Sequence, residues 1–151
     1  MTLLRLHSEP LRDEWLDAYG HLNEAYYLVP FSNASWAMQD HFEIGVEYFE
    51  ATGGALYTVE THLRYVKEVR APAAFDIETM ILEADAKRIR FAHTMFVDGI
   101  ERATFECMAL HFDTKGGHTA PLPEPVQAAL QAARIAELPD WAGRNISLHK
   151  R

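Results

Sequence analysis

The sequence predicts an α+β fold in which one long helix packs against an antiparallel sheet. Apolar residues at helical spacing occur early in the chain, between residues 24 and 42, whereas four later segments show the apolar–polar alternation of strands. No helical pattern lies between those four segments, which favours antiparallel neighbours over a parallel α/β arrangement. Asp98-Gly99, between the last two segments, is typical of a tight hairpin turn.

The chain begins with a segment, residues 3–16, that we expect to form an irregular strand. Pro10 interrupts this segment, and proline within a strand marks an edge or a bulge. We therefore expect the strand to stop at Pro10 and to resume over residues 11–16.

The helix is expected over residues 24–42, with Asn23 as its N-cap. Its apolar residues recur every three or four positions and form one stripe: Tyr27, Phe31, Ala34, Met38 and Phe42. Pro30 removes one helical hydrogen bond, so the regular helix is expected either to begin near Val29 or to bend there.

The four strands are expected where residues of alternating polarity follow one another: 57–65, 75–82, 88–97 and 101–113. Glu47 to Thr52 adds a short helix, which Gly53-Gly54 closes because glycine readily takes the left-handed conformation after a helix. The strands and the long helix together account for residues 1–115, the expected core of a single domain.

Residues 116–151 are expected to be a helical extension and tail of that same domain. Three prolines lead into an alanine-rich helix from Val126 to Glu137, and a polar tail begins at Trp141. We see no internal repeat that would indicate a second unit.

Composition excludes several classes of protein. The chain has 151 residues, enough for one domain with a hydrophobic core, and its net charge of −8 argues against a nucleic-acid partner. Cys107 is the single cysteine and lies in an apolar strand, so we expect a buried, inert thiol. No segment approaches the length of a membrane span, so we expect a soluble, cytoplasmic protein without a membrane partner.

The segment with the greatest density of reactive groups runs from Asp17 to Tyr27. It places a carboxylate, a glycine, an imidazole and an amide directly before the predicted helix: Asp17, Gly20, His21 and Asn23. The first N–H groups of a helix lack intrahelical acceptors and can stabilise a developing oxyanion. These four residues are therefore our candidate catalytic set.

Each member of this set has a chemical role and an ordinary alternative. Asp17 can act as a general base or a nucleophile, or it is a turn aspartate before Gly20. The N–H groups of Gly20 and His21 are candidates to polarise a carbonyl, and His21 can transfer protons near neutral pH. Asn23 either positions water or caps the helix.

The spacing D-x-x-G-H-x-N-x-x-Y, which begins at Asp17, resembles the signature of hotdog-fold acyl-CoA thioesterases of the 4-hydroxybenzoyl-CoA thioesterase-like branch. Residues 55–60, Arg64-Tyr65 and residues 84–88 extend the resemblance to the betainyl-CoA thioesterases of carnitine breakdown. The resemblance implies a hotdog fold, a long helix wrapped by an antiparallel sheet. It also implies thioester hydrolysis with Asp17 as the catalytic carboxylate. Family members form dimers or tetramers with the acyl-CoA site at the subunit interface, so we expect a homodimer or homotetramer.

A betainyl group carries a quaternary ammonium, which proteins hold with aromatic faces and a nearby carboxylate. The candidates for substrate binding are Trp15, Tyr19, Tyr26, Trp36 and Glu60. The phosphates of CoA require cations, and the candidates are Lys87, Arg88 and Arg90. The ordinary alternatives are that the aromatic residues belong to the core and that the charges form a solvated surface.

Other functions stay open on the sequence. A neutral aromatic or medium-chain acyl-CoA would suit the same aromatic residues, and a hotdog protein can bind acyl-CoA without hydrolysing it. The spacing from Asp17 to His21 also has the D-x-x-x-H form of some hydratases or dehydratases. The eight histidines do not occur at metal-ligand spacings, and no Walker-type glycine loop is present, so we expect neither a metal nor a cofactor.

Overall fold

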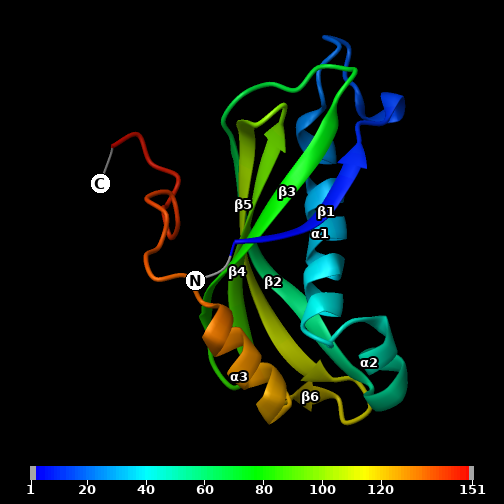
Figure 1. Ribbon diagram of the computed structural model, residues 1–151, viewed down its shortest axis with the longest axis vertical. Coiled ribbons are helices and arrows are strands. Elements are labelled where there is room, and N and C mark those ends of the chain that lie inside the picture. The colour runs from blue at the N-terminus through cyan, green and yellow to red at the C-terminus, as the bar shows by residue number, and fades with distance from the viewer. Residues whose placement is uncertain (1–2, 150–151) are drawn as a thin grey trace.

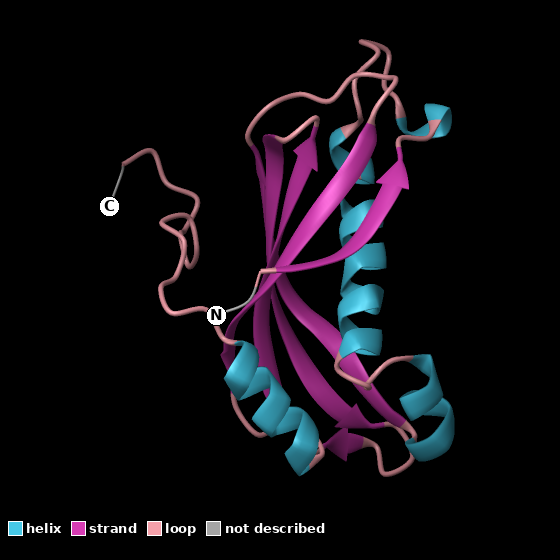
Figure 2. Ribbon diagram, viewed as in Figure 1, coloured by secondary structure: helices cyan, strands magenta, loops and turns pink. Residues whose placement is uncertain are grey.

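An antiparallel sheet curves around one long helix in the computed structural model, which describes residues 3–149 (Figure 1). The strands lie in the order β1-β3-β4-β5-β2, with β6 beside β5. Their bounds are β1 Leu4–Pro10, β2 Gly54–Tyr65, β3 Ala74–Ala84, β4 Arg88–Val97, β5 Ile100–Asp113 and β6 His118–Thr119. The helices are α1 Leu28–His41, α2 Val46–Thr52 and α3 Glu124–Ala133, with two 3₁₀ helices, η1 Asp13–Trp15 and η2 Glu24–Tyr26. Figure 2 shows α1 lying along the sheet and α3 near its lower end.

The four predicted strands are confirmed. β4 has the predicted bounds, and the β4–β5 hairpin turns at Asp98-Gly99, where both residues have positive φ. α2 ends as predicted at Gly53, whose left-handed φ of 79° lets its N–H reach the Phe49 carbonyl at 2.8 Å.

The long helix begins later than expected. Residues 24–26 form η2, and α1 proper starts at Leu28. Pro30 is therefore the third residue of α1, within the turn whose N–H groups have no intrahelical acceptor. Of the two alternatives that Pro30 left open, the late start is the one observed.

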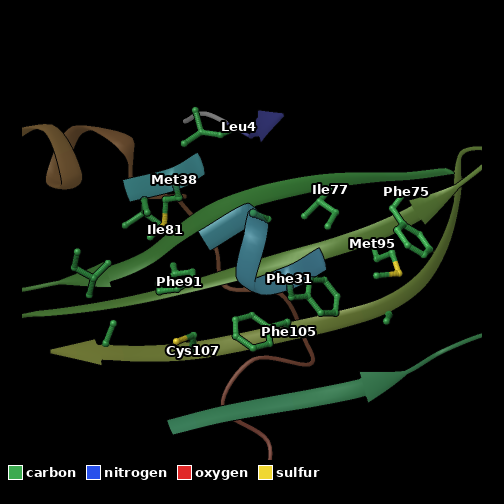
Figure 3. Packing of buried hydrophobic residues seen from close by; sticks show 14 of the residues in the cluster. Leu4, Phe31, Met38, Phe75, Ile77, Ile81, Phe91, Met95, Phe105 and Cys107 are labelled. Carbon is green, nitrogen blue, oxygen red and sulfur yellow. The ribbon is translucent and has the colours of Figure 1, made fainter. Parts of the chain in front are cut away.

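The predicted apolar stripe of α1 is confirmed as the centre of the core. Phe31, Ala34 and Met38 are fully buried. Figure 3 shows Phe31 and Met38 facing the sheet. The sheet contributes Phe75, Ile77, Ile81, Phe91, Met95, Phe105 and Cys107 to the same cluster. Burial raises the pKa of the Cys107 thiol to about 11, so this cysteine is a poor nucleophile at neutral pH.

The prediction that the first strand resumes over residues 11–16 is wrong. The strand ends at Pro10, and residues 13–15 form η1. Leu11 donates its N–H to the Ala73 carbonyl at 2.9 Å, after which the chain leaves the sheet. The turn brings Trp15 into the core, where only 5% of its surface is exposed.

The last helix is shorter than predicted because the residues that follow it pair with strand β3. β1 begins opposite Thr79, so the part of β3 beyond Thr79 lacks a neighbour on that side. Arg134 forms a bridge with Ile81, and Ile135 donates its N–H to the Ile81 carbonyl at 3.0 Å. The helix therefore stops at Ala133, where the predicted helix continued to Glu137. The predicted tail is described as far as residue 149, and its last two residues lie outside the described part.

Candidate active site

The Asp17 turn is held by hydrogen bonds within five residues. The Asp17 N–H donates to the His21 carbonyl at 2.8 Å, and the Gly20 N–H donates to the Asp17 carbonyl at 3.1 Å. Asp17 Oδ1 accepts the N–H groups of Tyr19 at 2.9 Å and His21 at 3.2 Å. Within residues 3–149, Asp17 Oδ2 accepts no hydrogen bond. The turn thus fixes the carboxylate by one oxygen and leaves the other available.

Gly20 allows this turn because its φ is 79°, a region that strains other residues. The N–H groups of Gly20 and His21, which we expected to polarise a carbonyl, are both engaged inside the turn. A different donor is open: the N–H of Glu24, the first residue of η2, has no acceptor in the described part of the chain.

Asn23 caps η2. Its side-chain oxygen accepts the Ala25 N–H at 2.9 Å, as an N-cap does. Its own N–H donates to the Trp15 carbonyl at 2.9 Å, which joins the turn to η1. Of the two roles considered for Asn23, the structure therefore shows the cap.

His21 lies beside a carboxylate that the sequence did not indicate. Its Nε2 lies 3.1 Å from Glu68 Oε2, without the alignment of a hydrogen bond. Arg70 Nε donates to Glu68 Oε1 at 3.2 Å, and an Arg102 N–H donates to the Glu68 carbonyl at 2.7 Å. No spacing in the sequence links His21 to Glu68, because the loop between β2 and β3 brings them together.

The predicted aromatic residues lie in different surroundings. Trp15 is buried, stacks on Tyr26 and Phe75, and has the Arg12 guanidinium 5.5 Å from its ring centroid. Tyr19 is 81% exposed at the tip of the turn. Trp36 is exposed on α1, one turn from Ser32 and two from Leu28, which are also exposed.

Glu60 lies on the other face of the sheet. It pairs with Met108 of β5, and Met108 pairs with Arg90 of β4, so these side chains share the face opposite the buried Cys107. Glu60 and Arg90 line a cavity of about 340 Å³ that the C-terminal segment partly covers. At its edge, the Gly143 N–H donates to Glu106 Oε1 at 2.8 Å.

The predicted CoA-binding residues cluster where β3 turns into β4. Arg88 forms an ion pair with Asp85 at 2.6 Å, and its hydrogen bond holds the pKa of the Asp85 carboxyl below its usual range. Arg90 is bound between two carboxylates, Glu83 at 2.8 Å and Glu106 at 2.6 Å. Lys87 has no ion-pair partner among residues 3–149.

The Asp17 turn and this cationic cluster lie at opposite ends of β3. His21 forms a bridge with Arg70, just before β3 begins at Ala74, whereas Asp85 follows its last residue. β3 has 11 residues, so its ends are roughly 33 Å apart at the usual rise per residue. Within this chain the two candidate regions are therefore far apart.

The described residues contain neither a group of metal ligands nor a membrane-spanning helix. Within residues 3–149, no group of three or more His, Cys, Asp or Glu side chains is arranged to hold a metal ion. In the same range, the helices are too short or too polar to cross a membrane.

Comparison with known proteins identifies thioesterases as relatives of this chain. A family model described as the thioesterase-like superfamily matches residues 11–130. The chain is 33% identical to the betainyl-CoA thioesterase of Pseudomonas aeruginosa, over 97% of this chain and 96% of that protein. It is 40% identical to the L-carnitine dehydrogenase/betainyl-CoA thioesterase of Agrobacterium fabrum over 95% of this chain, but it spans only 30% of that longer protein.

The solved structure of SAV2348 from Staphylococcus aureus, in complex with CoA, has the same fold. The TM-score is 0.88 over 99% of this chain and 98% of that chain, at 21% identity. The predicted hotdog fold, with its long helix against an antiparallel sheet, is thereby confirmed. Because the family model covers most of the sequence and a relative of similar length is one-third identical, the chain belongs to the thioesterase-like superfamily.

Proposed function

We propose that this protein hydrolyses betainyl-CoA to glycine betaine and CoA. The observation that carries the proposal is the Asp17 carboxylate, held by one oxygen and open at the other, in a chain of the thioesterase-like superfamily. The acyl group is inferred from relatives that are named betainyl-CoA thioesterases and are 33% and 40% identical.

The chemistry follows from the turn. Asp17 either attacks the thioester carbonyl carbon or removes a proton from the attacking water. The carbonyl oxygen becomes an oxyanion, the carbon–sulfur bond breaks, and CoA leaves as a thiol after gaining a proton. In the nucleophilic route the acyl group stays on Asp17 as a mixed anhydride, and water then hydrolyses it to glycine betaine and the free carboxylate. The open N–H of Glu24 is a candidate to stabilise the oxyanion. His21, which lies 3.1 Å from Glu68, is a candidate to carry the proton.

The acyl group would meet the aromatic residues next to the turn. Tyr26 and Tyr19 have exposed rings close in sequence to Asp17, and Trp15 supports Tyr26 from the core. Trp36 and Glu60 lie on other surfaces of the subunit. Their place in substrate binding therefore depends on a second subunit.

A homodimer would bring the Asp17 turn of one subunit close to the cationic cluster of the other. β2 is an edge strand of the sheet, and Tyr57 and Val59 are exposed on it. An exposed edge strand readily pairs with another strand. Antiparallel pairing of two β2 strands turns one subunit end for end, which moves its Lys87 and Arg88 toward the Asp17 end of the other. We infer that one CoA thioester then spans the two subunits, with its phosphates at Lys87 and Arg88 of one and its thioester at Asp17 of the other.

The dimer has its own test. Val59→Lys places a charge on the β2 edge and is expected to yield monomers in sedimentation, with loss of hydrolysis. Ile100→Lys adds the same charge at the exposed β4–β5 hairpin and is expected to leave both the assembly and the activity intact. Full activity in a monomeric Val59→Lys protein would contradict an interfacial site.

The substrate test is thiol release from a panel of thioesters. Betainyl-CoA is compared with butyryl-, hexanoyl- and benzoyl-CoA, and kcat/KM is measured for each. A preference for betainyl-CoA is expected because the aromatic rings and Glu60 favour a cation. Preference for a neutral thioester would support thioester hydrolysis but contradict a site for a cationic acyl group. Absence of all hydrolysis would indicate a protein that binds acyl-CoA without turnover.

A further inference from the structure

A second cavity, of about 330 Å³, lies at the end of β3 that is distant from Asp17. Two arginines of β4 and the arginine that follows α3 line it, together with two carboxylates: Arg88, Arg90, Arg134, Glu83 and Asp85. With neighbouring Lys87, four of the chain's 14 lysines and arginines gather here, although the chain as a whole has a net charge of −8. This local excess of positive charge suits an anion.

The carboxylates here already neutralise part of that charge. Arg90 is bound to Glu83 and Glu106, and only 16% of its side chain is exposed, so it is fixed within the protein. Arg88 is bound to Asp85 but is 62% exposed, so solvent competes for that ion pair. Among residues 3–149, Arg134 has no carboxylate within ion-pair distance, and its side chain donates a hydrogen bond to the neutral amide oxygen of Gln131 at 3.2 Å.

The fold holds Arg134 at this cavity. Its backbone pairs with Ile81 on the open edge of β3, and its N–H donates to the Gln131 carbonyl at 3.4 Å. The last turn of α3 is further tied to β3 by Gln131, whose side chain donates to the Ala84 carbonyl at 2.7 Å. The main chain of Arg134 is thus fixed at the cavity that Arg88 also lines.

We propose that Arg134, with Lys87 and Arg88, binds a phosphate group of the CoA portion of the substrate. This inference rests on the proposed function and adds a residue from the C-terminal helix to it. A guanidinium presents paired N–H donors that match phosphate oxygens. Arg90, whose donors are engaged by carboxylates, serves instead to hold Glu83 and Glu106 in place.

The test compares two substrates, one with and one without the phosphate-bearing nucleotide portion of CoA. Arg134→Gln is assayed with an acyl-CoA and with the pantetheine thioester of the same acyl group, which has no phosphate. The KM for the acyl-CoA is expected to rise about tenfold, as for one lost charge-assisted contact, with kcat unchanged. The pantetheine thioester is expected to show no change in kcat or KM, and it serves at the same time as a check of folding.

Matched variants sharpen the result. Arg5→Gln removes an equally exposed positive charge from β1, where Arg5 pairs with Glu78, and should leave the KM for the acyl-CoA unchanged. Arg134→Lys keeps the charge and is expected to recover part of the affinity. The thioester of 3′-dephospho-CoA then identifies the phosphate: if its KM does not rise in Arg134→Gln, the contact is with the 3′-phosphate, and if it rises, the contact is with the diphosphate.

Two results would overturn the inference. One is an unchanged KM for the acyl-CoA in Arg134→Gln, and the other is an equal change for the acyl-CoA and the pantetheine thioester. Either result leaves the proposed hydrolysis standing, because the wild-type protein is still active. Failure of the wild type to cleave either thioester would instead reject the proposed function itself.

Discussion

Two turns of this protein share a backbone plan and differ in their surroundings. In the turn at residues 17–21, Asp17 Oδ1 accepts two N–H groups, and Gly20 has a φ of 79°. In the turn at residues 113–117, Asp113 Oδ1 also accepts two N–H groups, at 3.0 and 3.1 Å, and Gly117 has a φ of 75°. Hydrogen bonding alone therefore does not distinguish a candidate catalytic aspartate from a structural one.

The surroundings of the two turns make the difference. The Asp113 turn connects β5 to β6, and its hydrogen bond from the Gly116 N–H holds the pKa of the Asp113 carboxyl below its usual range. The Asp17 turn leads into η2 and α1, beside His21 and Glu68. If Asp17 is the catalytic carboxylate, as proposed, its surroundings, the helix that follows it and the loop packed against it, distinguish it from Asp113.

The largest expected effect is on catalysis. Asp17→Asn keeps the side-chain oxygen that accepts the two N–H groups but removes the base or nucleophile, so kcat is expected to fall by about two to four orders of magnitude. Asp113→Asn makes the same chemical change in the matched turn and is expected to leave kcat unaltered. Thiol release measured for both variants tests the pair, and equal loss in both would show that only the turn matters.

A buried histidine outside both turns is expected to lower the free energy of unfolding in acid. His93 is fully buried between Ser35 and Thr79, whose hydroxyls lie 2.9 Å from its two ring nitrogens. Burial lowers its pKa to about 3, with a smaller contribution from His7. Since an unfolded histidine has a pKa near 6.5, only the unfolded state binds this proton between those values. Stability should therefore fall as the pH drops, by about 1.4 kcal/mol per pH unit from this residue.

Urea unfolding between pH 7 and pH 4.5 checks this expectation. His93→Gln cannot take up the proton, so its free energy of unfolding should vary less steeply with pH, whatever its absolute stability. Identical slopes for the two proteins would rule out His93 as the source.

A smaller effect is expected from the two glycines. Gly20→Ala and Gly117→Ala meet no atom within 4 Å of the added methyl group, so only the left-handed backbone opposes them. Each should lose about 1 kcal/mol of unfolding free energy. Only Gly20→Ala is expected to lower kcat as well, because it disturbs the carboxylate of Asp17. Thermal unfolding and thiol release separate the two effects.

The smallest expected effect is the loss in acid of the contribution that Asp113 makes to stability. Its folded pKa is lowered, so its contribution to stability is present above the ordinary pKa of an aspartate and disappears as the pH falls through the lowered value. Wild type should therefore be slightly more stable than Asp113→Asn at neutral pH, and the two should converge below that value. A difference that persists in strong acid would point to another cause.

The sequence by itself determined the elements whose cause is local. The apolar stripe of α1 and the alternation of the four strands are periodic, so they predict which faces are buried. The Asp17 turn is likewise contiguous, since its hydrogen bonds join residues at most four apart, and so its residues could be named before its geometry was known.

Only the tertiary structure decided what distant segments do to one another. Residues 11–16 look like a strand but leave the sheet, and the last helix stops early because the open edge of β3 offers Ile81 as a backbone partner to residues 134–135. Glu68 lies beside His21, and Arg134 lines the same cavity as Arg88. The members of each pair are about 46 residues apart along the chain. Side-chain periodicity describes a residue's face on its own element, whereas such pairings depend on how the sheet is assembled.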